Sequence, residues 1–172
     1  MGTVDNLWAP WRLEYVAGDK PDGCVLCAKV ESGDERAAHV VARGEHVFAV
    51  LNLYPYNNGH LMVVPYRHVA ELEELTADES AEAQRFLERG IRAARTALGA
   101  GGFNVGLNLG EAAGAGIASH LHWHLVPRWQ GDTNFMPVLA DLRVMPQHLD
   151  TTWQLLCDAW RADESEGHED GV

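Results

Sequence analysis

The sequence predicts an antiparallel α+β domain. Short alternating or apolar stretches come before and after one long amphipathic stretch, and a second amphipathic stretch lies near the C-terminus. Strands, helix, strands and helix in this order are typical of that class. The 172 residues are enough for one domain with a sizeable core, and we find no internal repeat, low-complexity tract or linker that would divide them.

The first half of the predicted sheet is a hairpin followed by a third strand. Residues 39–43 and 46–52 are alternating or apolar on either side of a turn at Gly44, and residues 61–65 follow the turn residues Asn57-Asn58-Gly59. We interpret the two asparagines as turn residues only.

A long helix is predicted next. Thr76 and Glu79 form a Thr-x-x-Glu capping box, and Gly99 ends the periodic stretch. The apolar residues at helical spacing, which we expect to pack on the sheet, are Ala83, Phe86, Leu87, Ile91, Ala94 and Leu98.

The second half of the chain contains two more predicted strands. Residues 103–109 alternate, residues 110–117 form a glycine-rich loop, and residues 120–127 hold a run of histidines. An apolar piece at 135–139 precedes a final helix near 148–161.

The histidine run has a strict alternation. On an extended strand, His120, His122 and His124 point to one face, and the apolar residues between them point to the other. A single histidine on an apolar strand is more often a core residue with a satisfied ring. Three in alternation need three hydrogen-bond partners on one face, which indicates a chemical role.

Composition restricts the partners. The chain has 47% hydrophobic and 22% charged residues, as soluble globular proteins do, and 25 acidic against 13 basic residues give a net charge of −12. That charge repels nucleic acids and anionic membranes, so local donors must bind any polyanionic nucleotide. The N-terminus shows no signal segment and no apolar run is long enough to span a bilayer, so we expect a cytoplasmic protein.

Three cysteines leave at least one outside any internal disulfide. The Cys-x-x-Cys spacing of Cys24 and Cys27 suits metal binding or redox chemistry, although two thiolates alone do not complete a zinc site. A reduced pair without metal is an alternative, and disulfide exchange is a third, without a thioredoxin-like βαβ pattern to support it. Cys157 is expected to be a small buried residue.

The ends of the chain differ from its middle. We predict an aromatic N-terminal arm at residues 1–22, which docks on the body or on a partner subunit, and a main domain with the C-terminal helix at 23–163. Residues 164–172 are predicted to be an acidic flexible tail.

The histidine run, with Pro127-Arg128-Trp129 after it, resembles the histidine triad (HIT) signature. Four further stretches are similar to its bacterial branch of diadenosine polyphosphate phosphorylases or ATP adenylyltransferases: residues 7–12, 24–27, 52–60 and 131–135. The resemblance spans about residues 7–160. It implies the HIT-like fold, with a sheet of about five antiparallel strands, a homodimer, and an adenine nucleotide or dinucleoside polyphosphate as substrate.

The resemblance also implies catalytic roles for the triad. His122 would attack the α-phosphorus to give a nucleotidyl-histidine intermediate, and neutral imidazole has the free lone pair that this attack requires. His124 would contact phosphate oxygens or assist the leaving group, and His120 completes the triad. Hydrolysis of a nucleoside phosphoramidate and non-catalytic nucleotide binding are the alternatives.

Further positions follow from the same resemblance. Residues expected to bind the nucleotide are Asn52 near the ribose, His60, Asn108 near the phosphates, the loop residues Gly114, Gly116 and Ile117, and Trp129. Leu51, Leu53 and Val63 would provide apolar walls for the base. Glycines more often only build turns, but here they directly precede the triad. Gly116 stands where many family members have Gln or Ser, so backbone donors of Gly114, Gly116 and Ile117, or Ser119, would substitute for that side chain.

A structural zinc ion is the cofactor that the resemblance implies. His68 and His120 would join Cys24 and Cys27 in a Cys2His2 site. Such an ion would fix the Cys-x-x-Cys segment to the catalytic strand.

Overall fold

A computed structural model describes residues 23–132 and 147–166 of the chain. A five-stranded sheet with the order β1-β2-β3-β5-β4 forms the centre of this part, and each neighbouring pair of strands is antiparallel. The strands are β1 (Val40–Arg43), β2 (Val47–Leu51), β3 (Leu61–Pro65), β4 (Gly102–Leu107) and β5 (Trp123–Arg128). The α+β class and the predicted number of strands are confirmed.

The helices include both of those predicted. α4 (Ala77–Leu98) begins at the Thr76 and Glu79 capping box, and its C-cap Gly99 adopts the left-handed conformation that glycine allows. α6 (Leu149–Glu166) is the C-terminal helix. Two short helices and two 3-10 turns were not predicted: α2 (Val25–Glu31), α3 (Glu35–Ala38), η1 (Leu72–Glu74) and η2 (Glu111–Ala113).

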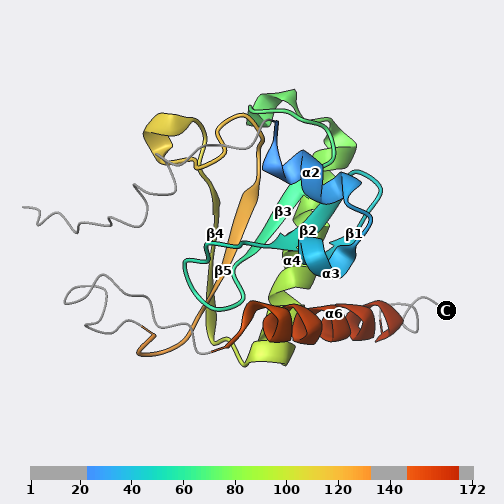
Figure 1. The fold of residues 1–172 in the computed structure, drawn as a ribbon. Helices are drawn as coiled ribbons and strands as arrows, with labels where there is room; N and C mark the ends of the chain where they lie inside the picture. The colour runs from blue at the N-terminus through green and yellow to red at the C-terminus, as the bar shows by residue number, and fades with distance from the viewer. Residues whose placement is uncertain (1–22, 133–146, 167–172) are drawn as a thin grey trace, which may run out of the picture.

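The sheet has one core on each face. On one face, alternate residues of β2, β3 and β5 pack with apolar residues of α4 and α6. On the other face, the remaining residues of β2 and β3 pack with Leu26 of α2 and Ala38 of α3. Figure 1 shows α2 and α3 in front of the sheet and α4 behind it.

Two residues of α4 fix the helix on the sheet. A Cβ on Gly90 would lie 3.0 Å from Leu61 Cδ2 and 3.1 Å from Leu125 Cδ1, so only glycine fits without a shift there. The buried carboxylate of Glu82 accepts the N–H groups of three successive residues, 45–47, in the β1–β2 hairpin. These three hydrogen bonds compensate for its burial and hold the hairpin against α4.

The expectation that all three histidines lie on one strand is wrong. β5 begins only at Trp123, so His124 is in the strand, whereas His120 and His122 precede it. β3 ends at Pro65, and the N–H of Leu121 donates instead to Val69 O at 2.7 Å. His120 and His122 therefore lie outside the sheet, and the chain enters it only at Trp123.

Several predictions concern the ends of the chain. α6 continues to Glu166, beyond the predicted end at 161 and into the range predicted as a tail. The rest of that tail, the arm at 1–22 and the apolar piece at 135–139 lie outside the described residues. Across residues 23–132 and 147–166, every helix is too short or too polar to cross a membrane.

Candidate active site and metal cluster

His122 has one bare ring nitrogen. Its Nδ1 lies 2.8 Å from the backbone oxygen of His120, and because a carbonyl only accepts, Nδ1 must carry the proton. Nε2 is then left with a free lone pair. The side chain is buried, with 5% of the residue exposed, and burial lowers its pKa below the ordinary value for histidine. His122 is therefore a neutral imidazole that can act as a nucleophile.

His124 has the opposite tautomer. The backbone N–H of Tyr56 donates to His60 Nδ1 at 3.0 Å, so His60 carries its proton on Nε2. That Nε2 lies 2.9 Å from His124 Nδ1, which must accept. The proton of His124 is therefore on Nε2. Burial, together with the neighbouring His122, lowers the pKa of His124 to about 4, so this ring is a neutral donor at pH 7.

The two rings lie side by side with different chemical roles. The centroids of His122 and His124 are 4.8 Å apart, and the ring planes are inclined at 75°. Asn108 Nδ2 is 3.4 Å from His124 Nε2, and because both nitrogens carry hydrogen, we assign the Asn108 amide with its oxygen toward His124. A nucleophilic nitrogen thus lies beside an N–H donor, a combination that suits attack on a phosphorus atom whose oxygens need hydrogen bonds.

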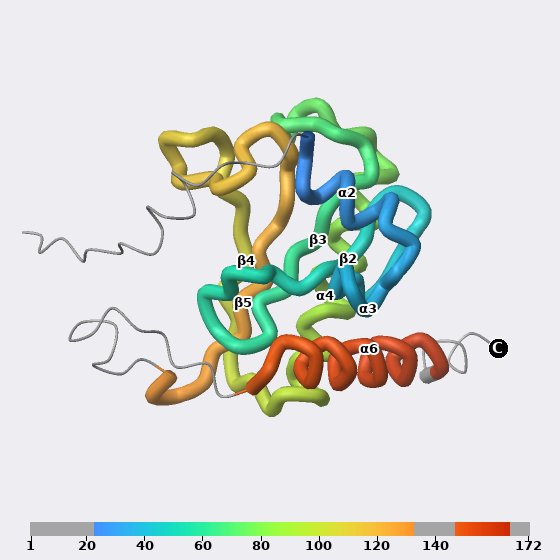
Figure 2. Tube along the Cα trace, in the orientation of Figure 1, coloured from blue at the N-terminus to red at the C-terminus, as the bar shows by residue number. Residues whose placement is uncertain are grey.

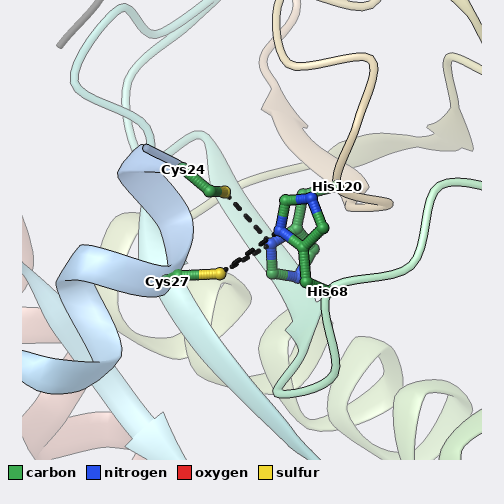
Figure 3. Close-up of side chains that lie close together, drawn as sticks. All are labelled: Cys24, Cys27, His68 and His120. Carbon is green, nitrogen blue, oxygen red and sulfur yellow. Dashed lines mark hydrogen bonds between the residues drawn. The ribbon is translucent and has the colours of Figure 1, made fainter. Parts of the chain in front are cut away.

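His120 belongs to a second cluster. Its Nε2 donates to Pro65 O at 2.9 Å, which leaves Nδ1 without a proton. Nδ1 is 3.2 Å from Cys24 Sγ and 3.5 Å from Cys27 Sγ, and His68 Nδ1 is 3.4 Å from Cys27 Sγ. Figure 3 shows the two cysteines of the α2 segment pointing toward both rings.

These four side chains can hold a metal ion. Their ligand atoms all lie within 4.8 Å of one another. Nitrogen and sulfur ligands at zinc distances in a tetrahedron are separated by about 3.5 Å, close to the separations found here. Burial and the adjacent Cys24 raise the pKa of the Cys27 thiol, so the pair resists joint ionisation until a cation lies between the sulfurs. The cluster combines the four residues predicted for a metal site.

Local structure explains how the thiols meet. Cys24 is the N-cap of α2 and Cys27 lies one turn further on, so the two-residue spacing places both sulfurs on one side of the first turn. Leu26, between them in sequence, is buried in the core under α2. Packing of Leu26 on this core, together with Val25, holds the first turn of α2 so that both sulfurs face His68 and His120.

Asn52 lies next to His60, the residue that is hydrogen-bonded to His124. Its side-chain Nδ2 is 3.4 Å from His60 Nδ1, and its Oδ1 accepts the N–H of Tyr54 at 2.9 Å. Its backbone N–H donates to His60 O at 2.9 Å. The structure thus joins the predicted nucleotide residues Asn52, His60 and Asn108 to His124, while their contacts with a nucleotide stay predictions.

The glycine-rich loop offers fewer donors than expected. The N–H of Gly114 donates to Glu111 O at 2.9 Å, so it is engaged in this conformation. The N–H groups of Gly116 and Ile117 donate to no acceptor within the described parts of the chain. Ile117 packs against the hydrophobic core that contains Leu26 and Met62. Met62 pairs with His124, so this core lies on the face of the sheet that His124 occupies. Gly116 and Ile117 therefore remain the candidates for phosphate binding.

The predicted apolar walls of the base pocket are partly wrong. Leu51 and Val63 are fully buried in the core on the α4 face of the sheet. Residues alternate between faces, and Met62 pairs with His124 in the register, so Met62 shares the face of the triad and Val63 does not. Leu53 is exposed and stays a candidate.

Trp129 lies at the opposite end of β5 from His122. Its indole Nε1 donates to Leu98 O at the end of α4, at 3.2 Å. The contact is a packing interaction within the chain, and the predicted role of Trp129 in binding a nucleotide stays a prediction.

No role in the site was predicted from the sequence for Tyr56, Asn57 or Asp132. The Tyr56 ring centroid is 4.7 Å from that of His60 and 5.6 Å from that of His124. Asn57, interpreted as a turn residue, also donates to Asp132 at 2.9 Å. The signal for Asp132 was its place in the stretch at 131–135, which the resemblance marked without assigning a function.

Comparison with known proteins agrees with this geometry. The HIT domain profile matches residues 34–131. AP-4-A phosphorylase of Mycobacterium tuberculosis (strain H37Rv) is 47% identical over 165 residues, covering 91% of this chain and 85% of that protein.

Solved structures share the fold. The crystal structure of a Zn-bound histidine triad family protein from Mycobacterium smegmatis has a TM-score of 0.69 at 29% identity and covers 84% of this chain and 97% of its own. A hypothetical histidine triad nucleotide-binding protein from Sulfolobus tokodaii has a TM-score of 0.66 at 24% identity, covering 81% and 93%. With its paired histidine rings and the matching profile, the chain belongs to the histidine triad family.

Proposed function

We propose that this protein is a nucleotidyl transferase that cleaves diadenosine polyphosphates through a nucleotidyl-histidine intermediate. The bare Nε2 of His122, placed beside the N–H of His124, carries this proposal. The name of the relative that is 47% identical, AP-4-A phosphorylase, supports the substrate class.

In the first step, the lone pair of His122 Nε2 forms a bond to the α-phosphorus. The bond from that phosphorus to the bridging oxygen breaks, and its electrons leave with the rest of the polyphosphate. For diadenosine tetraphosphate the leaving product is ATP. The Nδ1 proton remains on the bond to the His120 carbonyl, which favours the cationic ring of the intermediate. Without substrate, the Nε2–H of His124 faces the side-chain oxygen of Asn108. With substrate bound, this N–H would donate instead to the phosphate or leaving oxygens, where negative charge increases.

In the second step, an oxygen nucleophile attacks the same phosphorus. Inorganic phosphate would give ADP and water would give AMP, and in each case the N–P bond breaks and His122 regains its lone pair. Asn52 is proposed to bind the ribose, and Asn108 with the N–H groups of Gly116 and Ile117 the phosphates.

We also propose that Cys24, Cys27, His68 and His120 bind a structural zinc ion. The donor set of two sulfurs and two nitrogens is typical of closed zinc sites, and the structurally similar family member from Mycobacterium smegmatis is described as Zn-bound. An ion there would supply a cross-link between the α2 segment and the catalytic histidine segment. Free thiols at such a cluster also fit our proposal of a cytoplasmic protein.

A homodimer is proposed through the edge of the sheet. β4 is an outer strand whose far side has no partner strand within the described residues. Its Val105 is 47% exposed, which is unusual for a large apolar residue on an open edge. Pairing of β4 with β4 of a second copy around a two-fold axis would cover this edge.

The product spectrum tests the function. Purified protein is incubated with diadenosine tetraphosphate, with and without inorganic phosphate. ADP and ATP formed only when phosphate is present are the expected products, and AMP with ATP would show hydrolysis instead. Turnover of an adenosine phosphoramidate alone would show that the same nucleophile serves a different substrate. No product from any of the three mixtures would contradict the proposal and leave only nucleotide binding.

A further inference from the structure

Asp132 lies just beyond β5, and its side chain is only 9% exposed. Its carboxylate accepts four hydrogen bonds. Arg128 donates to both oxygens, at 2.6 and 2.8 Å, and the N–H of Trp129 donates at 3.1 Å. The fourth donor is the side-chain amide of Asn57, at 2.9 Å, from a loop 75 residues earlier in the chain. The ion pair of Arg128 and Asp132, which are four residues apart, would form without the contact from Asn57.

Asn57 connects this carboxylate with the loop that carries His60. Its amide also donates to Pro127 O at 3.2 Å, and its own backbone carbonyl accepts the N–H of His60 at 3.2 Å. Figure 2 shows the loop between β2 and β3 in teal beside the end of β5 in orange. The two bonds of the Asn57 amide therefore fix the start of the turn that ends at His60.

His60 is the residue that determines the tautomer of His124. It is fully buried, receives the N–H of Tyr56 and donates to His124 at 2.9 Å. If the turn moves, the bond to His124 Nδ1 lengthens, and the proton of His124 is no longer confined to Nε2. A donor displaced by about 1 Å can cost about a hundredfold in rate.

We propose that Asp132 is a positioning residue for the His124 donor and acts through Asn57 and His60. The proposal rests on the proposed function for its kinetic consequences, whereas the tautomer of His124 can be measured without any substrate. The interaction with Arg128 holds the pKa of Asp132 at about 2, so the carboxylate is charged throughout the working range. A charged acceptor forms a stronger bond to the Asn57 amide than a neutral one would.

Asp132→Asn tests the proposal directly. Asn57, Trp129 and Arg128 Nε all donate to the same oxygen, Oδ2, and Arg128 Nη2 donates to Oδ1. An amide either turns its NH2 group toward the first three donors or offers them a neutral oxygen, and in both cases the bond from Asn57 is weakened. We expect kcat to fall about ten- to a hundredfold, as for other residues that orient a functional histidine, with KM changed less than about threefold. Asp163→Asn is the matched control, because Asp163 also accepts from two nitrogens of an arginine, Nε and Nη2 of Arg92, at 2.6 and 2.9 Å. It joins α4 to α6 away from the histidines, so kcat should not change.

Nitrogen NMR of the histidine rings separates positioning from general stability. In the wild type, His124 should show a protonated Nε2 and a bare Nδ1, and Asp132→Asn should give a mixture of the two tautomers. Asn57→Ala should have the same effect, and the double variant should be no worse than either single change because both remove one path. Unchanged ring signals in Asp132→Asn would overturn the proposal, as would an equal loss of kcat in Asp163→Asn. If the wild type cleaves no nucleotide, the proposed function fails, and the ring signals still decide the role of Asp132.

Discussion

His120 and His122 are two residues apart and make opposite use of the same side chain. Each ring donates one N–H to a backbone carbonyl, but His120 does so through Nε2 and His122 through Nδ1. The bare nitrogen is therefore Nδ1 in His120, where it faces two thiols, and Nε2 in His122. The bare nitrogen of His120 is thus placed for the proposed metal site, and that of His122 for the proposed nucleophilic attack. The difference lies in which nitrogen meets a carbonyl oxygen, since both rings are buried and in both the pKa is lowered.

The comparison also shows how the two clusters are linked. The carbonyl that sets the tautomer of His122 belongs to His120 itself. Any displacement of His120 from the cluster of Cys24, Cys27 and His68 moves that oxygen. This cluster of four side chains, the proposed metal site, is therefore expected to influence catalysis through one peptide group, without touching the substrate.

The largest effect is expected from His122→Ala. Removal of the nucleophile should lower turnover of diadenosine tetraphosphate by at least about a thousandfold, because the unprotonated nitrogen of the neighbouring ring, His124 Nδ1, is already bonded to His60. Steady-state kinetics and mass spectrometry of the trapped intermediate measure this. Metal content should equal that of the wild type, because His122 is not one of the four clustered residues. This result would distinguish the role of His122 from that of His120. A covalent nucleotide still found on the variant chain would show that another residue is the nucleophile.

Cys24→Ser should have a smaller effect of a different kind. The hydroxyl is a poor ligand, so the metal content measured by elemental analysis should fall well below that of the wild type. Turnover should fall about ten- to a hundredfold as the His120 carbonyl loses its fixed place. Cys157→Ala is the control, since burial raises the pKa of that thiol to about 11 and it lies on α6, outside the cluster. Full activity in a metal-free Cys24→Ser would refute the link between the clusters.

The pH dependence of stability tests the neutral state of His124. Its pKa is about 4 in the folded protein and about 6.5 when unfolded, so the unfolded chain binds more protons between these values. Stability should therefore fall as pH falls through this window, by about 2 kcal/mol between about pH 7 and pH 5 from this residue alone. Urea unfolding of the wild type and His124→Gln at both pH values measures the difference, in which contributions common to both proteins cancel. An identical pH slope in the two would contradict the assignment of His124 as a neutral donor.

The sequence predicted most of the fold because its signals were local. The capping box of Thr76 and Glu79, the left-handed Gly99 and the alternating strands all depend on neighbours within a few residues. α2 and α3 were missed because they are short: α2 has 7 residues and α3 has 4, too few to show a period.

The site was predicted only in part, because some of its features are local in the sequence and others depend on residues far apart. Spacing and resemblance pointed to the triad and to the four residues that cluster as candidate metal ligands, but alternation was extended too far, so His120 and His122 were placed on β5. Which nitrogen of each ring is bare depends on carbonyl groups brought close by the fold, such as Pro65 O, 55 residues from His120. The bond from Asn57 to Asp132 spans 75 residues and leaves no periodic signal in the sequence.

The smallest effect is expected from Glu79→Gln, which tests how far the metal cluster depends on its surroundings. Glu79 accepts two bonds from Arg67, both at 2.7 Å, and Arg67 directly precedes His68, a proposed metal ligand. Metal affinity, measured by competition with a chelator, should weaken by less than about fivefold, because an ion pair with a half-exposed arginine contributes little. Glu88→Gln, an exposed change on the same helix, should have no effect. A loss as large as that of Cys24→Ser would mean that His68 is held by Arg67 and Glu79 more than by the α2 thiols, and the metal cluster would then extend to the N-terminus of α4.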